Sequence, residues 1–221
     1  MTIPDTLLTD VQQAVDIHQP ELAVSSTDTF IVLEGLFVVS GPEGPFDAYQ
    51  VKVLITAGFP TENPVVFEQG GRIPRTVNRH VFPEEGSCCL GVWEEWLLTA
   101  PDHRFETFLT GPMQDYFISQ TYFEANGMWP FGERSHGMLG VVEAYSDLLE
   151  VPQDAKIIVA YLNLLSLSQI KGHQLCPCGS GRRLRHCHRD ELQRLSSKVS
   201  PLMAKRMLGS ISPKKPAKQL R

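Results

Sequence analysis

Two adjacent cysteines in a glycine-bounded loop are the first residues in this sequence that could do covalent chemistry. Cys88 and Cys89 lie within Gly86-Ser87-Cys88-Cys89-Leu90-Gly91, after a proline-rich region. A thiol is only a few per cent ionised at neutral pH, yet it is a strong nucleophile that accepts and releases acyl groups readily. A thiol that carries an acyl group needs an exposed sulfur and a hydrogen-bond donor for the tetrahedral oxyanion. The pattern predicts a presented nucleophile rather than a packing residue.

The other three cysteines form a second cluster with metal-ligand spacing. Cys176, Cys178, Cys187 and His188 follow the pattern Cys-x-Cys-x8-Cys-His. Three thiolates and one imidazole suit a tetrahedral zinc ion and leave no open position for catalysis. A segment this short cannot build a core unaided, so we expect a structural zinc. Residues 171–190 resemble the SEC-C type zinc-binding motif, a small module known from the bacterial secretion ATPase.

Composition narrows the class of protein. With 221 residues and 42% hydrophobic content, the chain can form one domain of ordinary size and a small appendage. It has no run of 18 apolar residues, so no membrane span is expected, and its N-terminus lacks the pattern of a secretory signal. Five cysteines without disulfide-framework spacing indicate reduced thiols in a cytoplasmic protein.

Charge divides the chain into two parts. Residues 1–170 carry 7 basic against 23 acidic side chains, a net charge of −16, whereas residues 171–221 carry 13 against 2, a net charge of +11. Such asymmetry is typical of two modules with different partners. The basic end could meet an acidic protein surface, nucleic acid or its own acidic domain, or it could be a solvated tail. We expect protein partners rather than nucleic acid.

Periodicity and turn residues predict the order of the elements. Helices are expected over 4–19, 104–119, 137–150, 154–168 and 190–208, strands over 28–39, 47–57 and 65–68, and a disordered tail over 213–221. Gly111-Pro112 should perturb the second of these helices. Residues 69–101 read as a long irregular stretch, which in a compact domain is usually functional. The order predicts an α+β fold rather than alternating βαβ units.

A run of motifs surrounds Cys89 in a defined order. Residues 58–67 read Gly-Phe-Pro-Thr-Glu-Asn-Pro-Val-Val-Phe, His80 follows, residues 86–90 end in Cys-Leu, and Trp96 comes next. This series resembles the active-site region of ubiquitin-conjugating enzymes, in the divergent form found in bacteria. The resemblance covers about residues 20–150. It implies an N-terminal helix, an antiparallel meander sheet and C-terminal helices.

The resemblance also implies roles for individual residues. Cys89, which Leu90 follows, matches the family's nucleophile, and Cys88 is expected to be a small buried residue. His80 is expected to support either the loop backbone or an oxyanion. The family's asparagine, two residues after its histidine, is absent, because Phe82 stands there. Asn78 is a candidate substitute as an oxyanion donor.

The implied function is conjugation of a ubiquitin-like protein, carried as a thioester and passed to an amine on a protein target. An activating enzyme would supply the modifier, in a bacterial antiphage or related conjugation operon. The alternative is a catalytically inactive binding module of the same fold that recruits partners through its zinc knuckle. Two further alternatives have less support. A cysteine hydrolase would pair Cys89 with His80 or His136, but the sequence has no ordered Cys-His-Asn/Asp signature. A redox role for Cys88 and Cys89 is disfavoured because adjacent cysteines form a disulfide only with strain.

These patterns together predict four segments. Residues 1–150 should form the conjugating-like domain and residues 151–170 a connecting helix. The zinc knuckle should occupy residues 171–190. Residues 191–221 should form a basic helix and the disordered tail.

Overall fold

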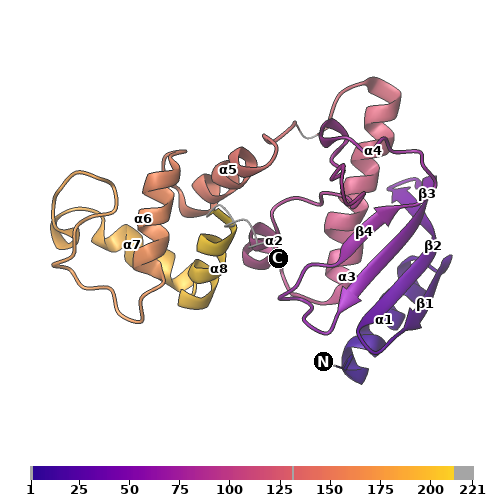
Figure 1. Cartoon of the computed structure of the whole chain (residues 1–221), viewed down its shortest axis with the longest axis horizontal. Helices are drawn as coiled ribbons and strands as arrows, with labels where there is room; N and C mark the ends of the chain where they lie inside the picture. The colour runs from indigo at the N-terminus through magenta and orange to yellow at the C-terminus, as the bar shows by residue number, and fades with distance from the viewer. Residues whose placement is uncertain (1, 131, 212–221) are drawn as a thin grey trace, which may run out of the picture. The chain divides into compact units, whose positions relative to one another are not determined.

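The computed structural model describes residues 2–130 and 132–211 (Figure 1). They form two compact units. The first comprises the described residues up to Trp93 together with those from Thr99 to Glu133, and the second comprises Glu94–Leu98 together with the described residues from Arg134 onward. This division does not follow the expected boundary after residue 150, since helix α5, Met138–Leu149, belongs to the second unit. The expected tail over 213–221 lies outside the described residues.

The first unit is built on a four-stranded antiparallel meander in the order β1-β2-β3-β4. Its strands are β1 Leu22–Ser26, β2 Phe30–Gly41, β3 Gly44–Thr56 and β4 Val65–Glu68. Strands β2 and β3 form a long hairpin whose register shifts at Val39/Ser40. Along both strands buried apolar residues alternate with more exposed ones, as expected for a sheet with one covered face. Together with the helices this is the expected α+β class.

Helices cover that face of the sheet. Helix α1, Asp5–His18, buries Val11, Ala14 and Val15. Helix α3 Phe105–Phe108, a π-helical turn Leu109–Met113 and helix α4 Gln114–Asn126 follow one another directly. Pro112 lies within the π-helical turn, which confirms the expected perturbation there. Phe117 of α4 packs between Phe37 and Tyr49, at ring-centroid distances of 5.0 and 4.8 Å.

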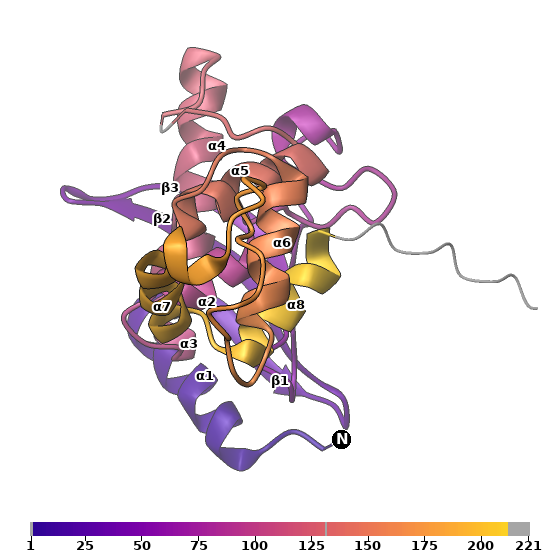
Figure 2. The same ribbon diagram turned by 90° about the vertical axis from the view of Figure 1, so that its left-hand side faces the viewer.

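The second unit is helical. It contains most of α2 Trp93–Thr99, together with α5 Met138–Leu149, α6 Ala155–Leu165, α7 Arg189–Lys198 and α8 Pro201–Ile211. Helix α6 contacts α5, α7 and α8, and Figure 2 shows these helices side by side. Helix α6 is therefore a central element of this unit rather than a connector.

Three expectations for elements are corrected by the structure. Strand β1 was not expected, because only Leu22 of its five residues is buried. The expected helix over 190–208 is two helices, since Pro201 begins a new one at α8. The stretch 69–101 contains a 3₁₀ turn, Val77–Arg79, and α2. Within the described ranges, no helix has both the length and the apolar character needed to cross a membrane.

Candidate functional site

A short hairpin presents the two adjacent cysteines. Its strands are residues 80–82 and 87–89, joined through a turn at Gly86. Gly86 has a φ of 75°, a left-handed conformation that is strained for residues with a Cβ. The N–H of Cys89 donates to the carbonyl oxygen of His80 at 2.7 Å. Cys89 therefore lies directly across the hairpin from His80.

The hairpin is attached to the edge of the sheet. The N–H of Cys88 donates to the carbonyl of Val66 in β4 at 2.7 Å, and Ser87 pairs with Phe67 in an antiparallel bridge. The cysteine segment thus lies between β4 and residues 80–82. The sheet positions the candidate nucleophile through backbone hydrogen bonds, which do not depend on the side chains involved.

Successive side chains of an extended strand point to opposite faces, so the thiols of Cys88 and Cys89 lie in different surroundings. Cys88 pairs with Val81, and both are buried, at 7% and 4% exposure. Cys89 and His80, one step along, are both half-buried. Burial raises the pKa of the Cys88 thiol to about 11, and a side-chain hydrogen bond with Tyr116 opposes the shift. Cys88 is therefore a buried, protonated residue, as expected, and Cys89 is the more accessible of the pair.

His80 has an unusual backbone conformation. Its φ is 48°, which is uncommon for a residue other than glycine. Its carbonyl oxygen accepts hydrogen bonds from Cys89 and from the Tyr116 hydroxyl, the latter at 3.3 Å. Its imidazole packs edge-on against Trp129 at 4.8 Å, and Nε2 lies 3.8 Å from an oxygen of Glu133. The backbone of His80 therefore holds the cysteine strand in place.

Asn78 is not joined to this arrangement by a hydrogen bond. It lies in the 3₁₀ turn Val77–Arg79 and is exposed. In the part of the chain that the structure describes, its side-chain amide makes no hydrogen bond. The structure therefore brings Cys89 and His80 together and leaves Asn78 at the surface.

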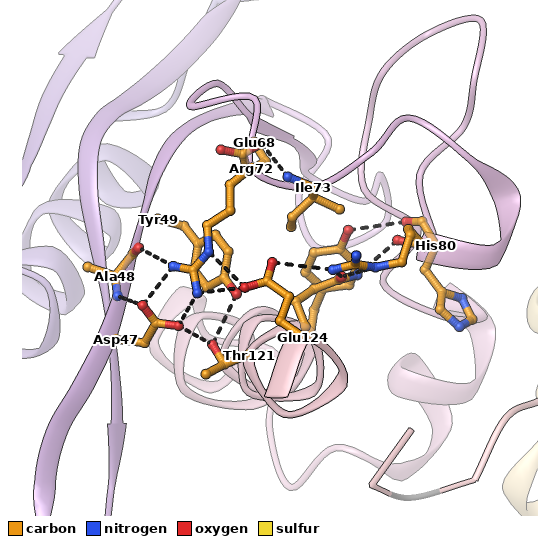
Figure 3. A network of polar contacts seen from close by, with 12 residues as sticks. Asp47, Ala48, Tyr49, Glu68, Arg72, Ile73, His80, Thr121 and Glu124 are labelled. Carbon is orange, nitrogen blue, oxygen red and sulfur yellow. Dashed lines mark hydrogen bonds and ion pairs between the residues drawn. The ribbon is translucent and has the colours of Figure 1, made fainter. Parts of the chain in front are cut away.

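A network that the sequence analysis did not identify holds the segment leading to His80 (Figure 3). Arg72 donates to both carboxylate oxygens of Asp47, at 2.7 and 2.6 Å, and pairs with Glu124 at 2.7 Å. Arg79 donates to Gln120 at 2.8 Å and pairs with Glu124 at 3.3 Å. Glu124 therefore bridges two arginines from the same loop, one of them adjacent to His80.

The charges of this network stabilise one another. The Arg72 hydrogen bonds lower the pKa of Asp47 to about 2, and the hydrogen bond to Asp47 raises the pKa of Arg72. Burial raises the pKa of Tyr49, whose ring lies beneath Arg72, to about 12. A signal was present in the sequence, because three of the seven basic residues before position 171 fall within eight positions, at 72, 75 and 79.

The four predicted metal ligands converge in the second unit. Their ligand atoms all lie within 4.8 Å of one another. Nδ1 of His188 is 3.2 Å from Sγ of Cys176 and 3.4 Å from Sγ of Cys187, and the sulfurs of Cys178 and Cys187 are 3.7 Å apart. This compact set of soft donors fits a tetrahedral metal ion.

The backbone around the cluster explains its glycines. Gly179 and Gly181 have φ values of 78° and 73°, so the chain reverses between the ligands through two left-handed positions. Cys176 N–H donates to the carbonyl of Arg182 at 2.9 Å across this turn. The hairpin brings Cys176 and Cys178 toward Cys187.

Hydrogen bonds and burial shift the pKa values of the thiols in this cluster in different directions. A hydrogen bond with Ser180 lowers the pKa of Cys178 to about 6, whereas burial raises the pKa of Cys176 to about 11. A guanidinium nitrogen of Arg182 donates to Sγ of Cys187 at 3.3 Å. The Arg182 guanidinium offsets part of the negative charge that three thiolates would bring to a metal site.

Comparison with known proteins supports the second cluster only. The SEC-C motif matches residues 174–190, a range that contains all four ligands. No curated protein and no solved structure matches the chain. The residues and the match together support a metal-binding motif.

Proposed function

We propose that this chain is a conjugating enzyme for a ubiquitin-like protein and that Cys89 carries the modifier as a thioester. The observation that carries the proposal is the division between the two cysteines. Cys88 is buried and protonated, whereas Cys89 is half-buried on the other face of the same strand, opposite His80. A carrier thiol needs this combination of fixed backbone and accessible sulfur.

The proposed reaction has two acyl transfers. The sulfur of Cys89 attacks the thioester carbonyl of the modifier's C-terminal glycine on the activating enzyme, whose thiol leaves with a proton. A target amine then attacks the new thioester and loses a proton, the Cys89 thiol leaves, and an amide bond forms. His80 lies opposite Cys89 in the hairpin register, and we assign it support of the loop and of the reacting carbonyl.

The fold supports the same reading. The helix, four-stranded meander and following helices have the order expected of a ubiquitin-conjugating-like fold. Lys52 is the one lysine among residues 1–133, and its ammonium lies 3.8 Å from Glu34. Few lysines reduce the number of amines in the chain that could consume an amine-reactive thioester.

We assign zinc to the cluster in the second unit, held by Cys176, Cys178, Cys187 and His188. With four protein ligands it would stabilise the fold rather than take part in acyl transfer. Arg182, Arg183 and Arg185 are exposed around it. This basic surface suits an acidic region of the protein target or of the activating enzyme.

A direct test combines the purified protein with ATP and with an activating enzyme and ubiquitin-like protein of the bacterial conjugation class proposed here. We expect an adduct on non-reducing gels that a thiol reductant removes. Cys89→Ala should abolish the adduct and Cys88→Ala should retain it. Equal adduct formation by Cys89→Ala would overturn the assignment.

A second candidate is a catalytically inactive binding module with the same fold. The exposed position of Asn78, without a hydrogen bond to the cysteine hairpin, favours it, because the Asn78 amide then does not support an oxyanion. Absence of any adduct with active partner proteins, together with co-purification of a partner that Cys89→Ala does not disturb, would support this module instead.

A further inference from the structure

A polar chain runs from α6 to the predicted metal ligands within the second unit. The hydroxyl of Tyr161 on α6 donates to Oε1 of Glu191 at 2.9 Å. The other carboxylate oxygen, Oε2, lies 3.9 Å from Nε2 of His188. The opposite ring nitrogen, Nδ1, faces the sulfurs of Cys176 and Cys187. The imidazole thus stands between a carboxylate and the thiol cluster.

Local geometry explains this placement. His188 occupies the N-cap position of α7 and Glu191 lies three positions later, so their side chains share one face of the first turn. Glu191 is partly covered, with 28% of its side chain exposed. The Glu191 carboxylate can therefore approach the His188 imidazole while Glu191 remains part of helix α7.

Tyr161 holds the Glu191 carboxylate through Oε1, the oxygen that does not face His188. It is 2% exposed, and a buried tyrosine hydroxyl requires a hydrogen-bond partner. Glu191 supplies that partner, and no residue of the 174–190 motif does so. Burial and this hydrogen bond raise the pKa of Tyr161, so the hydroxyl remains a donor.

We propose that Glu191 is a positioning residue for the metal site, which accepts the Nε2–H of His188 when Nδ1 binds the metal, and that Tyr161 holds Glu191 in place. A metal-bound histidine commonly donates its other N–H to a carboxylate, which fixes the tautomer and strengthens the ligand. The functional metal site then extends beyond the matched motif to α6 and α7. The inference rests on the proposed zinc site and is independent of conjugation at Cys89.

The test measures zinc affinity of the full chain by competition with a chromophoric chelator. We expect Glu191→Ala to raise the dissociation constant by roughly 10- to 100-fold. Glu191→Gln keeps an acceptor without the charge and should have a smaller effect, and Tyr161→Phe should weaken binding in the same direction. Asp190→Ala is the matched control, because it removes an adjacent exposed carboxylate from the same helical turn.

A second readout separates positioning from general stability. In the zinc-loaded protein, NMR of ¹⁵N-labelled histidine should show a protonated, hydrogen-bonded Nε2 on His188, and that signature should change in Glu191→Ala. Circular dichroism checks that each variant is folded.

Three results would overturn the inference. The first is an unchanged zinc affinity in Glu191→Ala, and the second is an equal loss in Asp190→Ala, which would indicate a helix-terminal charge effect. The third is a wild-type chain that binds no zinc, which would remove the metal assignment as well. None of these results bears on thioester formation at Cys89, so the two proposals fail separately.

Discussion

The carbonyl oxygen of His80 accepts the backbone N–H of Cys89, at 2.7 Å. The same oxygen accepts the hydroxyl of Tyr116, a residue that also hydrogen-bonds the Cys88 thiol. One backbone carbonyl therefore joins the candidate nucleophile to helix α4. The strand that carries both cysteines is fixed on one side by β4 and on the other by this contact.

We predict that the two neighbouring thiols differ in reactivity. Iodoacetamide at neutral pH should modify Cys89 at least ten times faster than Cys88, since a buried thiol with a raised pKa is both shielded and protonated. Peptide mapping by mass spectrometry measures the two rates. Comparable modification of Cys88 in folded protein would contradict the structure.

The Asp47–Arg72 pair should make stability depend on acidity. The pKa of Asp47 is lowered to about 2, so its contribution is present above the unfolded value near 4 and is lost as pH falls toward 2. After allowance for solvent screening we expect a loss of about 1 kcal/mol. Urea unfolding between pH 4.5 and 2.5 should show a shallower pH dependence in Asp47→Asn than in wild type. The exposed control Asp28→Asn should retain the wild-type slope, and an unaltered slope in Asp47→Asn would refute the prediction.

The ion pair between the buried Glu94 and the half-buried Arg206 should be sensitive to loss of one partner. The carboxylate is 5% exposed and accepts from Arg206 at 2.9 Å and from Ser210 at 3.0 Å. Arg206→Met should lower the free energy of unfolding of the second unit by about 2–3 kcal/mol, because it removes the counter-charge of a buried carboxylate whose partner is itself partly solvent-screened. Lys205→Met removes the same charge from an exposed neighbour and should have little effect. Adding Glu94→Gln to Arg206→Met should recover part of the loss, and failure to do so would argue against the pairing as the cause.

Metal removal should loosen the second unit and spare the first. A strong chelator should increase hydrogen exchange over residues 174–198, because the hairpin at Gly179 and the start of α7 are held together through the ligands. Exchange in β2 and β3 should stay constant. Mass spectrometry of exchange with and without chelator measures both regions, and unchanged protection at 174–198 would mean that the cluster folds without metal.

The sequence predicted what local patterns encode. Helix α1 and strand β4 were found from periodicity, and the metal ligands from spacing, because each depends on neighbours in the chain. Strand β1 was missed because only Leu22 of its residues is buried and because its place depends on distant contacts. Gln19, just before it, exchanges side-chain hydrogen bonds with the backbone of Val38, at 2.8 and 2.9 Å.

The candidate site shows the same limit. The thiols, His80 and Asn78 stand out by residue type, but which of them lie together is decided by strand pairing. The bridge from Arg72 to Asp47 joins positions 25 apart, and the one from Arg79 to Glu124 joins positions 45 apart. Local periodicity contains no information on such pairings. The place of α5 in the second unit likewise depends on its contacts with α6 and α8.

The assignment of Glu94–Leu98 to the second unit has a practical consequence. The chain leaves the first unit at Trp93 and re-enters it at Thr99, so no single cut separates the two bodies. In a fragment ending at residue 133, Glu94 would lose its hydrogen bonds from the Arg206 guanidinium and the Ser210 hydroxyl. Glu94 lies a few residues after Cys89 in the chain. Low stability of such a fragment would therefore reflect the lost partners of the Glu94 carboxylate. It would say nothing about the chemistry of Cys89.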